Sequence, residues 1–234
     1  MPATRGQALA CCAAMVDAYR QLAEIIEGVN VDSETTMKDL AIESDVVKAN
    51  VKALVKGSRV VDEHINADGS YSVKMSLPMF GSSTKSVASV AIPQAKPTDF
   101  ISDIPKVSET FVPTKEEKVE AVGYTGIIVD ASGLGLQGTF SPVVYDTNGR
   151  AIYGMLKIDR EYAIIHGMVE YSGDLQAASV NSRAGANLLV VKAVSVKGGG
   201  NFVNPVISVE DGDKILYANE KSGILGKHAV ALVK

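Results

Sequence analysis

The chain of 234 residues lacks tryptophan and has only five phenylalanines and eight tyrosines. Proteins that bind single-stranded nucleic acid or sugars rely on such rings for stacking, so this shortage disfavours both classes of ligand. The 23 basic and 27 acidic residues give a formal charge of −4, which offers no overall attraction to phosphate backbones or anionic lipids. We therefore expect no nucleic-acid partner.

Cysteine and histidine are also scarce. The two cysteines, Cys11 and Cys12, are adjacent, and neighbouring side chains of a helix point in different directions, so we expect free thiols and no disulfide. The three histidines, at positions 64, 166 and 228, lie in unrelated segments. Neither residue type therefore shows the spacing of a metal site or of a histidine-based catalytic site.

Long apolar runs are missing as well, because no run reaches the roughly 18 residues of a membrane span. The apolar stretch at 8–16 follows a single basic residue and is followed at once by Asp17, so it favours a helix over a secretory signal. We expect a soluble, exported chain whose signal has been removed before Met1. Membrane contact is then expected only through a lipid anchor that is absent from this chain.

The composition itself, 46% apolar and 21% charged residues, is that of a folded protein. Near the N-terminus, apolar and polar residues over 9–26 recur with the period of an amphipathic helix, which we expect to end at Gly28. We expect one face to pack in a core. Its members are Leu9, Cys12, Met15, Val16, Tyr19, Leu22, Ala23 and Ile26.

Four more elements are predicted in the first 90 residues. Polar and apolar residues alternate over 29–37, which predicts a strand. Ser44 or Asp45 caps a helix that ends near Lys56, with Val47, Val51, Leu54 and Val55 facing inward. Residues 59–65 and 71–79 predict a hairpin around Asp68-Gly69. The order helix, strand, helix, strand, strand predicts a small α+β domain over residues 1–90.

Residues 91–120 contain four of the eight prolines, Pro93, Pro97, Pro105 and Pro113, with little periodicity. Prolines restrict the backbone, so this segment is predicted to be a stiffened connector. Residues 121–234 are predicted to form a second α+β domain, with helices packed on a mostly antiparallel sheet. Its expected elements are strands at 124–131, 142–146, 150–154, 188–196, 203–209 and 228–233, and helices at 159–166 and 208–218. Asn148-Gly149 marks a hairpin between the second and third of these strands.

The segment 133–138 reads GLGLQG, a GxGxxG pattern placed directly after a strand. A dinucleotide site needs a helix after the glycines, with its N-terminus facing the phosphates. Pro142 and the hairpin at Asn148-Gly149 occupy that position, so we interpret the motif as a glycine turn at a strand end. Asp130, a charged residue in an apolar strand, is expected to cap this turn.

Other acidic residues carry no catalytic pattern. Asp62-Glu63 and the group Glu210, Asp211 and Asp213 do not match a calcium loop, so we expect them on solvated faces. No Gly-x-Ser-x-Gly motif is present. We expect no catalytic, cofactor-binding or metal-ligating residues and no cofactor.

Two stretches resemble bacterial families. The alanine-rich helix carries a D-A-x-R-x-L core that runs into G-V-x-V, and this N-terminal block resembles the twenty-kilodalton outer-membrane lipoprotein family and the N-terminal domain of the flagellar assembly protein FlgT. The matching positions are Asp17, Ala18, Arg20, Leu22, Gly28, Val29 and Val31. A second stretch resembles the C-terminal part of longer members. Its matching positions are Thr125, Gly126, Asp130, Gly133, Gly135, Ser141, Pro142, Tyr145 and Asp146.

The resemblance implies an envelope-associated protein without enzymatic chemistry, which in some relatives belongs to a ring around the flagellar motor. We therefore expect a structural or assembly protein of the periplasm, outer membrane or cell surface, with copies of itself and other envelope proteins as partners. The alternative is a periplasmic binding module for a small ligand or an envelope fragment. Cys11 and Cys12 lie inside the expected helix and do not match the lipidated cysteine of a lipoprotein.

Overall fold

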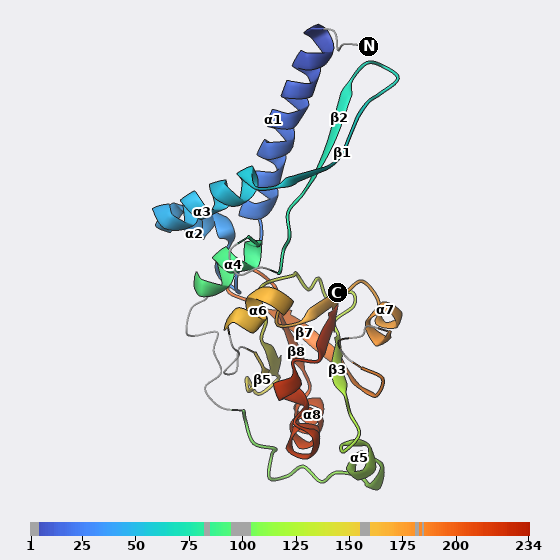
Figure 1. The fold of residues 1–234 in the computed structure, drawn as a ribbon. Coiled ribbons are helices and arrows are strands. Elements are labelled where there is room, and N and C mark those ends of the chain that lie inside the picture. Colours follow the sequence, from blue (N-terminus) through green and yellow to red (C-terminus); the bar gives the residue numbers. More distant parts are fainter. Residues whose placement is uncertain (1–4, 82–84, 95–103, 155–159, 181–182, 184) are drawn as a thin grey trace. The chain divides into compact units, whose positions relative to one another are not determined.

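The computed structural model describes residues 5–81, 85–94, 104–154, 160–180, 183 and 185–234 (Figure 1). Contacts between Cα atoms divide the chain into two compact units. Unit 1 comprises Met1–Val29, Thr36–Gln94 and Ile164–His166, and unit 2 comprises Asn30–Thr35, Ala95–Ala163 and Gly167–Lys234. The predicted domain limits at residues 90 and 121 remain predictions.

Unit 1 consists of helices and one hairpin. Its elements are α1 (Arg5–Glu27), α2 (Met37–Glu43), α3 (Asp45–Lys56), β1 (Arg59–Ile65), β2 (Tyr71–Ser76), α4 (Val87–Ala91) and the 3-10 turn η1 (Ile92–Gln94). Strands β1 and β2 pair antiparallel and form a two-stranded sheet of their own. The glycine predicted for the turn, Gly69, has a positive φ of 84°, so the predicted hairpin is confirmed.

The predicted strand over residues 29–37 is wrong. The Asp32 carboxylate accepts hydrogen bonds from the backbone N–H groups of Glu34 and Thr35, at 2.8 and 2.7 Å, and so stabilises a turn. Thr36 then caps α2 in a capping box with Asp39. A turn and a short helix therefore replace the strand, and the order in this region is helix, helix, helix, strand, strand.

The apolar face predicted for α1 is correct only in part. Ile26 is buried and Met15, Tyr19, Leu22 and Ala23 are half-buried, but Leu9, Cys12 and Val16 are exposed. Helix α1 packs on β2, and a two-stranded sheet covers a narrow strip of a helix. The small residues Ala10, Ala14 and Ala18 of this helix are half-buried as well. By contrast, the four inward positions predicted for α3 are all buried.

Unit 2 is built around one sheet. The elements in this part of the chain are α5 (Lys115–Glu120), β3 (Gly126–Asp130), β4 (Val144–Asp146), β5 (Ala151–Tyr153), α6 (Arg160–His166), β6 (Glu170–Ser172), α7 (Leu175–Ser179), β7 (Leu188–Lys197), β8 (Asn204–Ile207), α8 (Val209–Ser222), the 3-10 turn η3 (Ile224–Lys227) and β9 (Val230–Val233). The sequence did not predict α5, β6 or α7. Residue 97 of the predicted connector lies outside the described residues.

The seven strands have the order β5-β4-β8-β7-β3-β9-β6. The pairs β3–β7, β3–β9, β6–β9 and β4–β8 are parallel, and only β4–β5 and β7–β8 are antiparallel. The predicted α+β class is confirmed, but the prediction of a mostly antiparallel sheet is wrong. The continuous apolar runs of β3 and β9 are buried on both faces, which is typical of parallel strands.

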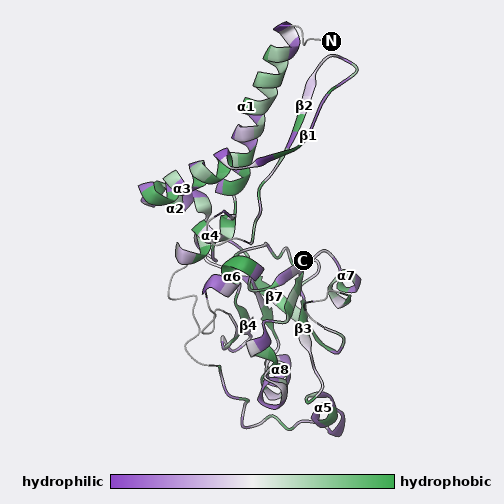
Figure 2. Ribbon diagram, in the orientation of Figure 1, coloured by the Kyte–Doolittle hydropathy of each residue, from purple (hydrophilic) through white to green (hydrophobic). Residues whose placement is uncertain are grey.

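Two helices cover this sheet. Helix α7 packs on β3, β6 and β9, and α8 packs on β4, β5 and β7. Figure 2 shows hydrophobic residues along these strands, whereas much of α8 is polar. The side chains of Ile127, Ile128, Ile152, Ile207, Ile215 and Leu216 are almost completely buried. Among the helices of the described residues, none combines the length and the apolar character needed to cross a bilayer.

Candidate functional site

The glycine motif forms a turn and no phosphate loop. After β3, Gly133 and Gly135 adopt positive φ angles of 75° and 73°. The backbone N–H of Gln137 donates to the carbonyl of Phe202 at 2.8 Å. All residues from 131 to 143 are described, and none of them is helical. Without a helix N-terminus at the glycines, this loop cannot cradle a pyrophosphate in the dinucleotide manner.

Asp130 caps that turn, as predicted. Its carboxylate accepts hydrogen bonds from the hydroxyl of Ser132 and from the Ser132 backbone N–H, the latter at 3.0 Å. The hydroxyl bond and then the backbone bond lower the pKa of Asp130. The group is therefore a stable carboxylate that orders the end of β3.

The densest polar cluster joins Arg150 to two buried aspartates. The Arg150 guanidinium donates through Nε to Asp146 at 2.6 Å and through Nη1 to Asp213 at 2.9 Å. Asp213 also accepts from the backbone N–H and the hydroxyl of Ser108, at 2.9 and 3.0 Å. The cluster thus connects the β4–β5 turn, α8 and the segment before α5. The expectation that Asp213 lies on a solvated face is wrong, since its side chain is 4% exposed.

The surroundings of Asp213 favour its ionised form. Burial alone raises the pKa of Asp213, but the bonds from Ser108 and Arg150 outweigh it and leave the pKa lowered. Asp146 accepts two further bonds, from the backbone N–H groups of Asn148 and Arg150. Each carboxylate is engaged by its own neighbours, so the cluster acts as a clamp within unit 2.

The histidines and cysteines do not converge. His64 lies 3.2 Å from Asp62 on exposed β1, and the His228 ring packs against Tyr162 with centroids 5.1 Å apart. Burial, and then Arg183, lower the pKa of His228. Cys11 and Cys12 are free thiols, as predicted. Across the described residues, no group of three or more potential metal ligands is present.

The junction of α2 and α3 exposes an apolar and acidic surface, which we call the elbow (Ile42, Glu43, Asp45 and Val46). Ile42 is 74% and Val46 69% exposed. Ser44 shapes the elbow, because its backbone N–H bonds to Leu40 at the end of α2 and its hydroxyl accepts from Val47 at the start of α3. Ser44, in an extended conformation, is thus the one residue between the two helices, and the two apolar side chains lie on either side of it in the chain.

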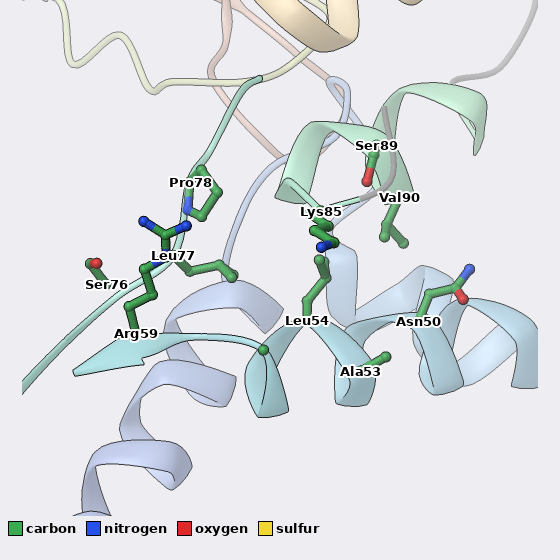
Figure 3. A pocket seen from close by; sticks show the side chains of 11 residues that line it. Asn50, Ala53, Leu54, Arg59, Ser76, Leu77, Pro78, Lys85, Ser89 and Val90 are labelled. Carbon is green, nitrogen blue, oxygen red and sulfur yellow. The ribbon is translucent and has the colours of Figure 1, made fainter. Parts of the chain in front are cut away.

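A groove of about 1010 Å³ lies between the second half of α3, the start of β1, the end of β2 and α4 (Figure 3). Its apolar lining includes Leu54, Leu77, Pro78 and Val90. Two cations line it as well, with Arg59 on the Pro78 side and Lys85 on the Leu54 side (Figure 3). Among the described residues that line the groove, none is acidic.

Neither cation of the groove is neutralised within unit 1. In the part of the chain that the structure describes, Arg59 and Lys85 have no ion-pair partner. The groove therefore presents unpaired positive charge beside apolar side chains, an arrangement that suits an anionic group attached to an apolar one.

A family model described as the second domain of Treponema pallidum Tp0624 matches residues 126–234. This part of the chain is similar to that domain. The match begins at the first residue of β3 and takes in all seven strands of the unit 2 sheet. None of the curated proteins matches the chain. The resemblance to the lipoprotein family and to FlgT stays a prediction.

Sequence reasoning missed the groove and the elbow. Four segments separated by up to 40 residues build the groove, and no local pattern connects Asn50 with Val90. The sequence gives only a weak indication of the elbow, which is that Val46 is apolar but does not lie on the inward face predicted for α3. What the sequence could not show is that no other described element covers Val46.

Proposed function

We propose that this chain is a non-enzymatic structural or assembly protein of the bacterial cell envelope, which acts by protein–protein association with copies of itself and with other envelope proteins. One observation carries the proposal: unit 1 leaves apolar residues exposed, because its helices and its two-stranded sheet do not cover them. All seven residues of β1 are exposed, and isolated two-stranded sheets are marginally stable in water.

The exposed apolar residues lie on several elements of unit 1. Leu9 and Val16 are exposed on α1, Val61 and Ile65 on β1, and the elbow adds Ile42 and Val46. Single exposed apolar side chains are ordinary, and unit 2 has them too, with Val112 80% and Val180 78% exposed. In unit 1 they coincide with a two-stranded sheet whose strand β1 is exposed throughout, and this coincidence favours a surface that a partner covers. Association supplies the apolar contacts that unit 1 lacks.

The polar residues singled out in the sequence stabilise the fold by capping and ion pairing, which supports a structural role. Asp130 caps a turn, and Arg150 holds Asp146 and Asp213 together. The envelope location rests on the resemblance of the N-terminal block, and it comprises the periplasm, the outer membrane and the cell surface. A ring or surface assembly, such as the flagellar type, is the form that we propose.

The test of this function is the oligomeric state of the purified full chain. Light scattering over a range of concentrations, combined with electron microscopy, should show concentration-dependent assemblies. A chain that stays monomeric at every concentration and captures no envelope protein would refute the proposal.

The groove favours a second candidate function, a periplasmic binding module for a small ligand or an envelope fragment. Its volume of about 1010 Å³ accommodates a small molecule, and Arg59 and Lys85 select for an anionic group. A thermal-shift screen against anionic envelope fragments tests it. A true ligand present at a hundred times its Kd should stabilise the protein by about 2.7 kcal/mol.

A further inference from the structure

We infer that the elbow of one copy docks into the groove of the next copy, so that the chain associates head to tail. This inference rests on the proposed self-association and specifies its contact. The elbow consists of Ile42, Glu43, Asp45 and Val46, and Arg59 and Lys85 are the cations of the groove. The two surfaces come from the same unit of the molecule.

The two surfaces are complementary in charge. The elbow carries the two acids Glu43 and Asp45, both exposed. The described lining of the groove contains Arg59 and Lys85 and no acid. In the described residues Glu43 has no ion-pair partner either. Docking therefore brings two carboxylates to two unpaired cations, and opposite charges of this kind guide both the encounter and the register of an interface.

The two surfaces are complementary in apolar character as well. Ile42 and Val46 are among the most exposed large apolar side chains of the chain, at 74% and 69%. Leu54, Leu77 and Val90 offer an apolar lining in the groove. Leu54 and Val90 are already buried and Leu77 is half-buried, so the gain comes mainly from Ile42 and Val46. Full burial of a side chain of this kind contributes about 1.5–3 kcal/mol.

A single copy cannot make this contact with itself. The elbow lies at the first residues of α3, and the groove lies beside its second half, where Ala53 and Leu54 line it. Nine residues separate Asp45 from Leu54, and the helix rises 1.5 Å per residue, so about 13 Å of rigid helix keeps them apart. Elbow and groove can meet only between two copies.

Head-to-tail docking is heterologous, because each copy uses its elbow on one neighbour and its groove on another. Each copy that docks its elbow still offers a free groove, and each filled groove belongs to a copy with a free elbow. Repetition of one heterologous contact produces a closed ring when the rotation closes and a filament when it does not. This geometry matches the ring or surface assembly proposed above.

The test uses charge reversal on the full chain, with assembly measured by light scattering and sedimentation. Glu43→Arg and Arg59→Glu should each weaken assembly by about thirtyfold or more, since each places like charges in the contact. The double variant should assemble again, because residues 43 and 59 then attract each other with exchanged signs. An equimolar mixture of the two single variants should also assemble, because each supplies the surface that suits the other.

Lys52→Glu is the matched control. Lys52 is exposed on α3 and does not line the groove, so the same reversal of charge on the same helix should leave assembly unchanged. Circular dichroism and thermal unfolding of each monomer should match the wild type, because the substituted side chains are exposed. A destabilised fold would not be restored by combining two substitutions, so restoration separates docking from misfolding.

The outcomes also separate this inference from the proposed function. If the wild type never assembles, both the proposed function and this inference are refuted. If the wild type assembles and both single variants assemble equally well, only the head-to-tail contact is refuted. Failure of the double variant to recover refutes it too. If Arg59→Glu abolishes a thermal shift by an anionic envelope fragment and leaves assembly intact, the groove holds a small ligand and the inference is overturned.

Discussion

Strand β1 of unit 1 has all seven residues exposed, whereas all four residues of β9 in unit 2 are buried. The difference follows from the neighbours of each strand. Strand β9 lies between β3 and β6 in a sheet of seven strands and is covered by α7. Strand β1 pairs only with β2, and the helix α1 packs on β2. Unit 2 buries the central strands β3 and β9 with its own residues, whereas unit 1 leaves β1 exposed.

This comparison separates a unit that buries strands of its own from one that, under the proposed function, association would complete. Apolar burial stabilises a fold in proportion to the area removed from water. The almost fully buried Ile127, Ile128 and Leu232 make that contribution within unit 2. Val61 and Ile65 of β1 are about half exposed, so the single chain gains only part of that contribution from them, and the proposed partner would supply more. The following predictions test this contrast.

The largest effect is expected from Arg150→Met in unit 2. The substitution removes the cation that pairs with Asp146 and Asp213, whose side chains are 0% and 4% exposed. Two buried carboxylates left without it should lower the free energy of unfolding by about 3 kcal/mol or more. Chemical denaturation measures the loss. Arg20→Met is the control in unit 1, because Arg20 pairs with Asp17 and Glu24 on exposed α1 and should change nothing measurable.

A second contrast uses the same substitution in both units. Ile128→Ala removes a side chain that is 0% exposed and should cost about 3 kcal/mol, through lost burial and the cavity that remains. Ile42→Ala removes a side chain that is 74% exposed and should change the stability of the monomer by less than about 0.5 kcal/mol. It should instead weaken assembly. Equal losses of monomer stability would contradict the contrast.

The pH dependence of unit 2 should reflect Asp213. Its pKa is lower in the folded protein, because the bonds from Ser108 and Arg150 outweigh burial. A lowered folded pKa stabilises the fold above the unfolded pKa, near 4, and this contribution is lost as the pH falls through the folded value. Denaturation curves between pH 7 and pH 2 should therefore show an acid loss that is smaller in Asp213→Asn. The same loss in both proteins would assign the acid sensitivity to other carboxylates.

Much of the local structure could be predicted because its causes lie within a few residues. Ser44 starts α3 by accepting a bond from Val47, and Gly69 permits the hairpin turn. The strand predicted over residues 29–37 failed for an equally local reason. The alternating pattern of this segment competes with the capping box of Thr36 and Asp39, which starts helix α2.

Pairing between distant strands could not be predicted in the same way. The parallel partner of Ile128 is Val190, and the hairpin signals near Asn148-Gly149 report only on β4 and β5. The apolar runs of β3 and β9 were the available sign of strands buried on both faces. The groove is built from segments between α3 and α4 that meet only in the folded chain. No sequence pattern therefore indicates that its two cations lie at the same site.

The smallest effect is expected from Val61→Thr, which keeps the shape of a side chain at the irregular step of β1, where the register shifts between Val60 and Asp62. Val61 is 53% exposed, so the hydroxyl stays hydrated and stability should change by less than about 0.5 kcal/mol. The matched substitution Val129→Thr places the same hydroxyl at a position 1% exposed, where an unsatisfied polar group costs about 1–3 kcal/mol. Denaturation of the two variants compares them directly. If Val61→Thr costs as much as Val129→Thr in the monomer, β1 is already covered by its own chain, and unit 1 needs no partner to complete it.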